Sequence, residues 1–404
     1  MMTLVEQHRI KKSDPLFWKL DHLCYLSKNL YNATLYMIRH HFFNTKEYLS
    51  YASVNRQMII ERNPDYYALN TKVSQQTQKL VDKSFKSYFA LHKKYSCGKI
   101  ANRPHIPKYL DKNGRQVVMF TNQAISTKRV GFVKLGGTDI YVPTKQKSIQ
   151  FVRLVPHGSS VTVEIGYFHE SIPYVDNNRY AAIDLGVDNL ATLTFTDDKP
   201  IIFNGKPVKS INQYYNKRLT TLRSKQDLSP QPHRNTKRID ALTSKRFCKI
   251  KDYMHKISHE IVNQLVSHNV TNLVIGYNKG WKQDANMGSV NNQKFVQIPF
   301  LMLLNMLMYK CELVGIRCET IQESHTSKCS FLDKEDICHH DKYVGRRVHR
   351  GLFRSSNGQT INADVNGSLN IMRRYLNVVK NTDIYDIVNL IEVCSTPSVF
   401  TVKL

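Results

Sequence analysis

Two aspartates stand where they could bind divalent metal ions. Asp184 ends the apolar run "AAIDLGV", which is typical of a buried strand, and Gly186 permits a turn directly after it. Asp364 lies in "NADVNGSLNI", at the predicted start of the last helix. Mg²⁺ prefers carboxylate oxygens, and two such ions activate water and stabilise the leaving oxygen in phosphodiester cleavage. Both residues are therefore candidates for a nuclease site, although Asp364 could instead stabilise its helix N-terminus.

The segments around Asp184 predict an α/β domain. Three strands, "YAAIDLGV", "LATLTFT" and "PIIFNG", precede a basic helical hairpin, the strand "TNLVIGY", the helix "IPFLMLLNMLMYKCELVG" and the strand "IRCETIQ". Consecutive strands followed by alternating helix and strand indicate a mixed sheet. A strand that ends on an acid and leads into a three-stranded meander is the usual start of a ribonuclease-H-like domain, where acids from separate elements converge on metals.

The N-terminal part has a different pattern. Residues 15–98 contain apolar positions at spacings of three and four, which predicts two or more packed helices. From "NRPHIPKYL" onward, short alternating runs separated by Gly, Asn and Pro predict strands. Their spacing indicates a small β-barrel that the N-terminal "TLVEQHRI" completes and into which the helices are inserted.

The net charge indicates a polyanionic partner. The chain has 58 Lys and Arg against 32 Asp and Glu, a formal net charge of +26. Such self-repulsion does not favour folding, and nucleic acid explains it better than a solvated basic surface does. A membrane partner is not expected, because the charge is spread along the chain rather than gathered on one amphipathic helix.

The predicted helical hairpin is the most basic segment, with fourteen Lys or Arg and three Asp between residues 201 and 256. Phosphate contacts supply most of the affinity of proteins for nucleic acids. We therefore expect nucleic-acid contacts from the cations of this segment: Lys217, Arg218, Arg223, Lys225, Arg234, Lys237, Arg238, Lys245 and Arg246.

Length and targeting signals set further expectations. A chain of 404 residues suggests two or three domains. It contains no apolar run of the ~20 residues that span a bilayer, and its N-terminus lacks the apolar core of a signal peptide. We expect a protein of the bacterial cytoplasm or nucleoid, and the eight scattered cysteines agree with a reducing compartment.

Several longer motifs occur in a fixed order: "LSKNLYNATLYMIR", "AIDLGVDNLATL", "KSINQYYNKR", "NKGWKQ", "NNQKFVQIPF", "TSKCSFLD", "RGLFRSSNG" and "NADVNGSLNI". Together they closely resemble the TnpB (OrfB) family of transposon-encoded RNA-guided nucleases, which is related to type V CRISPR effectors. In this resemblance Asp184 matches the first catalytic aspartate and Asp364 the last. It implies Mg²⁺ or Mn²⁺ as cofactor, a transposon-derived guide RNA, and a double-stranded DNA target with a short flanking motif.

The resemblance also implies a multidomain α+β fold. A wedge-type β-barrel would comprise residues 1–13 and 99–178, with a helical recognition module inserted at 14–98. A RuvC-type, ribonuclease-H-like nuclease domain would comprise 179–323 and 361–404, interrupted by a basic, nucleic-acid-binding insert at 324–360.

The insert departs from the family in its zinc ligands. The family's insert usually carries two Cys-x-x-Cys pairs that bind zinc, and a closed structural zinc site requires four ligands. Here Cys329 is followed by Leu332 at the partner position, and Arg354 and Asn357 stand at the second pair. We therefore expect a degenerate zinc ribbon without zinc. A site improvised from Cys329 and the run Cys338, His339 and His340 is the less favoured alternative.

The middle catalytic acid is also missing. The family's strand corresponding to "LVIGYN" usually ends in a catalytic glutamate, whereas this chain has Gly276. The strand "IRCETIQES" should lie beside it, as a right-handed crossover would place it. Its last acid, Glu323, would then face Asp184 and could replace the missing ligand, although it could equally be an exposed acid at a strand end. Glu319 is the weaker candidate, because it lies about 13 Å further back along the strand.

Two functions follow from these motifs. The favoured one is an RNA-guided DNA endonuclease with a relocated middle acid, because a protein that only binds has no evident use for both Asp184 and Asp364. The alternative is a cleavage-dead, RNA-guided DNA-binding protein that represses transcription, which Gly276 alone would favour. A transposase that joins DNA strands has no specific support in the sequence.

Overall fold

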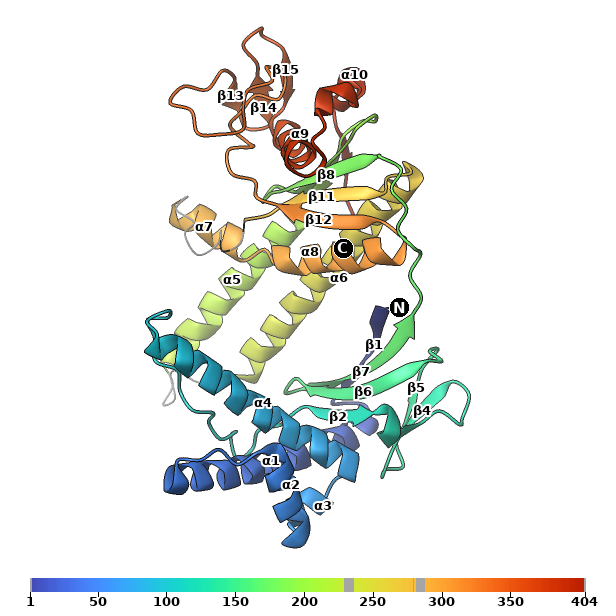
Figure 1. The fold of residues 1–404 in the computed structure, drawn as a ribbon, viewed down its shortest axis with the longest axis vertical. Coiled ribbons are helices and arrows are strands. Elements are labelled where there is room, and N and C mark those ends of the chain that lie inside the picture. Colours follow the sequence, from blue (N-terminus) through green and yellow to red (C-terminus); the bar gives the residue numbers. More distant parts are fainter. Residues whose placement is uncertain (1, 229–235, 279, 281–287, 403–404) are drawn as a thin grey trace. The chain divides into compact units, whose positions relative to one another are not determined.

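The computed structural model describes residues 2–228, 236–278, 280 and 288–402. It contains two compact units, Met1–Glu170 and Ser171–Leu404 (Figure 1). Each unit combines helices with strands, so the chain is a multidomain α+β protein, as predicted. Within the described ranges, no helix combines the length and the apolar content needed to cross a bilayer.

The N-terminal unit consists of four helices and two small antiparallel sheets. The helices are α1 (Leu16–Thr45), α2 (Tyr51–Ile60), α3 (Pro64–Tyr67) and α4 (Thr71–Ser96). The larger sheet has the order β1-β7-β6-β2, with β1 (Met2–Lys11), β7 (Ser160–His169), β6 (Ile149–Pro156) and β2 (Val118–Thr121). The smaller sheet contains β3 (Ile125–Ser126), β4 (Phe132–Leu135) and β5 (Tyr141–Pro143).

The described strands of this unit do not close into one barrel. β1 pairs with β7 along its whole length, but β1 and β2 are the two edges of the larger sheet. β3, β4 and β5, of two to four residues each, pair only with one another within the described residues. The helices and both sheets nevertheless share one core, which includes Leu35 of α1, Val133 of β4 and Val152 of β6.

The C-terminal unit is built on a mixed six-stranded sheet of order β12-β11-β8-β9-β10-β16. β8 (Tyr180–Leu185), β11 (Asn272–Gly276) and β12 (Arg317–Ile321) run parallel, whereas β9 (Asn189–Phe195) is antiparallel to β8 and to β10 (Ile201–Asn204). β16 (Ser398–Phe400) pairs parallel with β10 at the edge. The predicted neighbours "TNLVIGY" and "IRCETIQ" thus do lie side by side.

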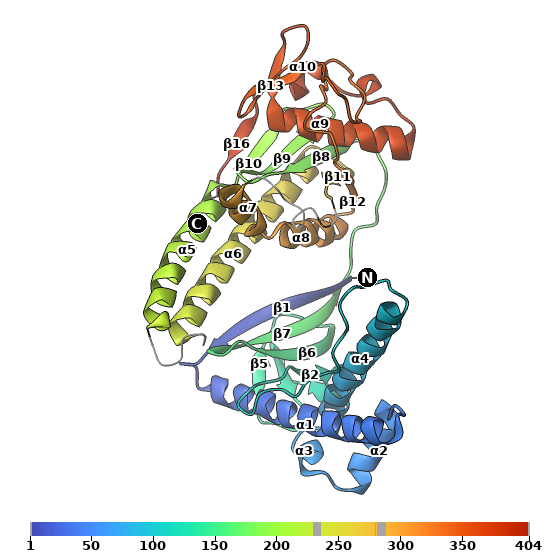
Figure 2. The same ribbon diagram turned by 90° about the vertical axis from the view of Figure 1, so that its left-hand side faces the viewer.

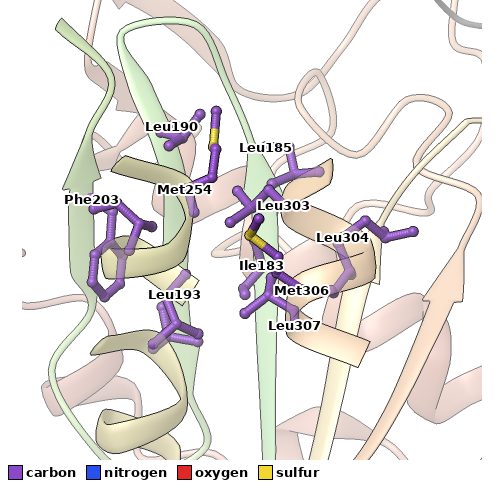
Figure 3. Packing of buried hydrophobic residues seen from close by; sticks show 14 of the residues in the cluster. Ile183, Leu185, Leu190, Leu193, Phe203, Met254, Leu303, Leu304, Met306 and Leu307 are labelled. Atoms are coloured by element: carbon purple, nitrogen blue, oxygen red, sulfur yellow. The ribbon is translucent and has the colours of Figure 1, made fainter. Parts of the chain in front are cut away.

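Helices cover both faces of this sheet (Figure 2). α5 (Lys206–Asp227), α6 (Lys237–Ser267) and α8 (Phe300–Leu313) lie on one face, and α9 (Ala363–Tyr375) lies on the other. The first face buries a large apolar cluster in which Ile183 of β8 and Leu193 of β9 pack with Met254, Leu303 and Leu307 (Figure 3). The near-continuous apolar sequence of β8 follows from this two-sided burial.

The insert between β12 and α9 is a small three-stranded sheet of β13 (Arg346–His349), β14 (Leu352–Arg354) and β15 (Thr360–Asn362). Two side chains of α9 attach the preceding loop to this helix: Asn366 Nδ2 and Asn370 Nδ2 donate to the carbonyl oxygen of Cys329 at 2.9 and 2.8 Å. The remaining short elements are α7 (Ser289–Val296), α10 (Leu390–Val393) and the helical turns Asn122–Ala124, Leu376–Lys380 and Ile384–Asp386.

Candidate active site

The two predicted acids of the sheet lie on its α9 face. Side chains alternate between the faces of a strand, and Ala182 of β8 and Val274 of β11 both pack in the cluster beneath α9. Ala182 pairs with Val274, so the next residues on this face are Asp184 and Gly276. Gly276 in turn pairs with Ile321, the last residue of β12. Glu323 follows two residues after the strand, and its carboxylate lies beside Gly276 and Ile371 of α9, on the face that the sequence predicts.

The carboxylate of Glu323 lies against Gly276. A Cβ atom at position 276 would be 2.6 Å from Glu323 Oε2 and 2.4 Å from Ile371 Cδ1 of α9, closer than real Cβ atoms approach. A side chain at 276 and the observed position of Glu323 therefore exclude each other. Glu323 thus reaches the point where an acid at the end of β11 would begin.

One oxygen of Glu323 is buried without a hydrogen-bond donor. Among the described residues, Glu323 Oε2 has no partner, while the backbone N–H of Glu323 donates to Asn278 Oδ1 at 3.0 Å. A buried, unpaired carboxylate oxygen costs free energy unless a donor or a cation compensates it. This oxygen therefore fits a metal ligand better than it fits an exposed acid at a strand end.

Asp184 is close to both other acids. Burial raises the pKa of Asp184 well above its usual value, the negative charges of Glu323 and Asp364 raise it further, and Arg347 acts in the opposite direction. Burial also raises the pKa of Glu323, to about 7. Two carboxyl groups with raised pKa values beside a third acid are typical of a site that binds a cation.

The Asp364 carboxylate accepts hydrogen bonds from two side chains rather than capping its own helix. Asn362 performs the capping: its Oδ1 accepts from the backbone N–H groups of Asp364 and Val365. The Asp364 carboxylate accepts from Asn189 Nδ2 at 2.6 Å through Oδ2 and from Arg347 at 3.2 Å through Oδ1. Sequence reasoning missed both partners, because neither residue type nor spacing distinguishes Asn189 or Arg347 from other polar residues of loops.

The weaker candidate, Glu319, is engaged elsewhere. Its carboxylate accepts a hydrogen bond from the Tyr375 hydroxyl and lies 3.7 Å from Arg317. These partners lie at the opposite end of β12 from Asp184. Glu319 is therefore a structural residue between β12 and α9.

The acids do not form a closed coordination sphere. Among the residues that the structure describes, no three His, Cys, Asp or Glu side chains are grouped closely enough to hold one metal ion. The chemistry of the donor set is nevertheless suitable, because Asp184, Glu323 and Asp364 offer only hard oxygen ligands. Like charges also repel one another, which opposes their convergence on a single point.

The raised pKa of Glu323 predicts a pH-dependent stability. Between its usual value of 4.5 and about 7, the native state binds a proton that the unfolded state has released. The free energy of unfolding should therefore fall as pH rises through this window when EDTA removes divalent ions. We expect Glu323→Gln to be more stable than the wild type at pH 8, by up to about 3 kcal/mol, and to lose this advantage near pH 4. Chemical denaturation at both pH values measures it, and an equal difference at both would contradict it.

The cysteines of the insert do not assemble a zinc site within the described residues. Cys329 is buried and its Sγ lies 3.6 Å from the carbonyl oxygen of Cys338, whereas the Cys338 Sγ lies 3.3 Å from His340 Nε2. Direct hydrogen bonds join the loop after Cys329 to the loop after β14. Asp333 accepts from the backbone N–H of Ser356 at 3.0 Å and from its hydroxyl at 2.5 Å.

We therefore predict that elemental analysis of the purified protein finds well under one zinc per chain. The expected four thiolates are reduced to Cys329, and hydrogen bonds such as Asp333 to Ser356 take over part of the cross-linking. Stoichiometric zinc that disappears on mutation of Cys338 or His340 would reveal an improvised site.

Most described cations of the α5–α6 hairpin are exposed, but Arg246 is held by protein partners. Arg246 donates to Asn212 Oδ1 at 2.7 Å and to the Gln297 carbonyl oxygen at 3.2 Å, and its guanidinium lies 4.9 Å from the Tyr215 ring centre. Burial lowers the pKa of Arg246. These contacts argue against Arg246 as a phosphate contact, while Arg234 lies outside the described residues. The other predicted contacts in the described residues are all exposed: Lys217, Arg218, Arg223, Lys225, Lys237, Arg238 and Lys245.

Charge reversal at Arg218, Arg223, Lys237 and Arg238 together should weaken RNA binding and flatten its dependence on salt. Four lost phosphate contacts would reduce the slope of log K against log salt by about three. Titrations of the guide RNA at several KCl concentrations measure this slope, with the exposed neutral residues Gln213 and Thr220 changed to alanine as the control. An unchanged slope would show that the hairpin faces solvent.

Two family models match parts of the C-terminal unit, and the first of them begins in β7 of the N-terminal unit. The OrfB_IS605 model, described as a probable transposase, matches residues 160–282, and the Cas12f1-like TNB domain model matches residues 300–371. The first range contains Asp184, and the second contains Glu323 and Asp364. The TNB model also covers the insert that lacks the usual cysteines.

A curated relative and several solved structures are also similar. The "TnpB-like protein ORF457" of Acidianus two-tailed virus is 24% identical over 214 residues, which cover 50% of this chain but only 43% of the relative. A Cas12f1–sgRNA–target DNA complex is 14% identical with a TM-score of 0.38, covering 91% of this chain and 98% of that one. CasPhi-2 (Cas12j) bound to crRNA is 9% identical with a TM-score of 0.46, covering 93% of this chain and 98% of that one.

TM-scores of 0.38 and 0.46 do not establish a common fold. The sequence matches, by contrast, confirm the resemblance carried by the motifs, and the chain is a relative of the TnpB (OrfB) family and of the type V effectors.

Proposed function

We propose that this chain is an RNA-guided DNA endonuclease of the TnpB type, whose middle catalytic acid has moved from position 276 to Glu323. The observation that carries the proposal is the position of the Glu323 carboxylate, with Oε2 2.6 Å from the point where a Cβ atom at 276 would lie. The family matches support the RNA-guided class. Retention of Asp184 and Asp364 supports cleavage rather than binding alone.

Asp184, Glu323 and Asp364 would hold Mg²⁺ or Mn²⁺, which when bound supplies an activated water and a stabilised leaving oxygen. Asp184 contributes from the buried strand β8, whose packing on both faces fixes its backbone. Asp364 contributes from the first turn of α9, with its orientation set by Asn189. Glu323 contributes an oxygen that no other described group binds.

The nucleic-acid partners follow from charge and family. The guide RNA would be transposon-derived and would be bound by the wedge segments 1–13 and 99–178, the recognition helices 14–98 and the exposed cations of α5 and α6. Guide pairing would select a double-stranded DNA target, while the protein recognises a short flanking motif. The RuvC-type nuclease would comprise 179–323 and 361–404, with 324–360 as its nucleic-acid-binding insert.

One observation favours the alternative, a cleavage-dead RNA-guided DNA-binding protein that represses transcription. The three acids are not grouped closely enough to hold one metal ion in the described structure. Loss of a single ligand in such a site can remove the reaction while binding persists.

Co-purification separates the two functions. The RNA bound to the protein expressed with its flanking sequence would be sequenced, and DNA matched to its guide segment would be incubated with the complex and Mg²⁺. The endonuclease predicts cleavage of matched but not mismatched DNA. Stable, guide-dependent binding without cleavage in Mg²⁺ or Mn²⁺ would support the repressor, and absence of any guide-dependent binding would contradict both.

A further inference from the structure

The two oxygens of Asp364 have donors of different kinds. Oδ2 accepts from Asn189 Nδ2 at 2.6 Å, and Asn189 is the first residue of β9, within the nuclease sheet itself. Oδ1 accepts from Arg347 at 3.2 Å, and Arg347 belongs to β13 of the insert, where its side chain is 46% exposed. The first donor is therefore part of the rigid sheet, whereas the second is a long surface side chain.

The turn before β9 fixes Asn189. A Cβ atom at Gly186 would lie 2.5 Å from the Asn189 carbonyl oxygen, so this close turn requires glycine. The backbone N–H of Gly205 donates to the Asp188 carbonyl oxygen at 2.7 Å, and Asn189 pairs with Asn204 of β10. The segment is thus held on both sides, and the same turn joins Asn189 directly to the strand that carries Asp184.

Asn189 consequently joins Asp364 to the turn that follows Asp184, from a distant part of the chain. Its amide can donate to Asp364 without carrying a charge, so it orients the carboxylate without competing with a cation for it. Side chains that orient metal ligands in this way typically contribute 10- to 100-fold to metal affinity.

We infer that Asn189 is a positioning residue for the nuclease: it anchors Oδ2 of Asp364 and leaves Oδ1, which only the exposed Arg347 side chain contacts among the described residues, as the oxygen that would bind a cation. The inference rests on the proposed metal-dependent function. Asn189 itself touches neither the cation nor the scissile phosphate in this arrangement. Its substitution should therefore change the metal requirement rather than guide binding.

Calorimetric titration of the RNA-free, full-length protein with Mn²⁺ tests this inference without relying on activity. Binding to Asp184→Ala protein is subtracted as the background. Asn189→Ala should weaken Mn²⁺ binding by about 10-fold or more, and Asn189→Leu, which keeps the side-chain volume, should have the same effect if the alanine variant does not fold. The Mg²⁺ concentration for half-maximal cleavage should rise in parallel.

Asn204→Ala is the matched control. Asn204 is the backbone partner of Asn189, but its side chain contacts Thr401 and the backbone N–H of Lys206 rather than an acid. Wild-type Mn²⁺ affinity in the Asn189 variants overturns the inference, and so does a loss no larger than that of Asn204→Ala, which would mark a structural role. A wild-type protein that binds no more Mn²⁺ than Asp184→Ala would instead remove the proposed metal site, and the inference with it.

Discussion

Glu323→Gln is expected to reduce Mg²⁺-dependent cleavage of guide-matched DNA by at least about 100-fold while leaving guide RNA binding unchanged. Glutamine keeps the shape of the side chain beside Gly276 but lacks the negative charge that a hard cation requires. Single-turnover cleavage at saturating guide measures the effect.

The matched control is Glu319→Gln, on strand β12, which ends two residues before Glu323. Glu319 binds the Tyr375 hydroxyl instead of facing Asp184, so its variant should retain cleavage. Equal cleavage by Glu323→Gln and wild type would show that the middle ligand has not moved to β12.

The exchange of positions offers a second comparison for the same acid. Gly276→Glu in a Glu323→Ala background returns an acid to the end of β11 after the competing carboxylate has been removed. Ile371 would still lie 2.4 Å from the new Cβ atom, so Ile371→Val should improve any recovery of cleavage. Gly276→Glu in the wild-type background should instead impair cleavage, because the new side chain would displace the Glu323 carboxylate from its position beside residue 276.

Asp184→Ala is expected to abolish cleavage with RNA affinity within about threefold of wild type. Asp184 is a proposed ligand on a buried strand, whereas phosphate contacts are expected from exposed cations elsewhere. Asp197→Ala is a suitable control, because Asp197 pairs with Arg179 outside the site. Equal loss of cleavage and RNA binding would mean that Asp184 is structural.

Strand periodicity made much of the six-stranded sheet predictable. The apolar run before Asp184 and the strand–helix–strand pattern after it indicated a mixed sheet, and the order β12-β11-β8 follows. Because side chains alternate along a strand, adjacency of β11 and β12 was enough to bring Glu323 to the face of Asp184. The sequence argument could not decide whether its side chain turns toward Gly276, which depends on the packing of Ile371 and α9.

Contacts between distant segments were less predictable. The hydrogen bond from Asn189 to Asp364 joins residues 175 positions apart, and no local pattern reports it. Arg246 was expected to bind phosphate because it lies in the most basic segment of the sequence. A count of charges does not reveal that Asn212 and Gln297 accept hydrogen bonds from its guanidinium. Closure of the N-terminal strands into a barrel also failed to appear among the described residues, because alternation defines strands but not the pairing of their edges.

The position of Glu323 relative to the bound ion tests the central claim most directly. A structure of the guide–target complex with Mn²⁺, in which anomalous scattering locates the ion, would show its ligands without reference to rate. We predict that an oxygen of Glu323 coordinates an ion that Asp184 also binds. An ion held by Asp184 and Asp364 with Glu323 turned away, or no ion at these acids, would contradict the relocation of the middle ligand.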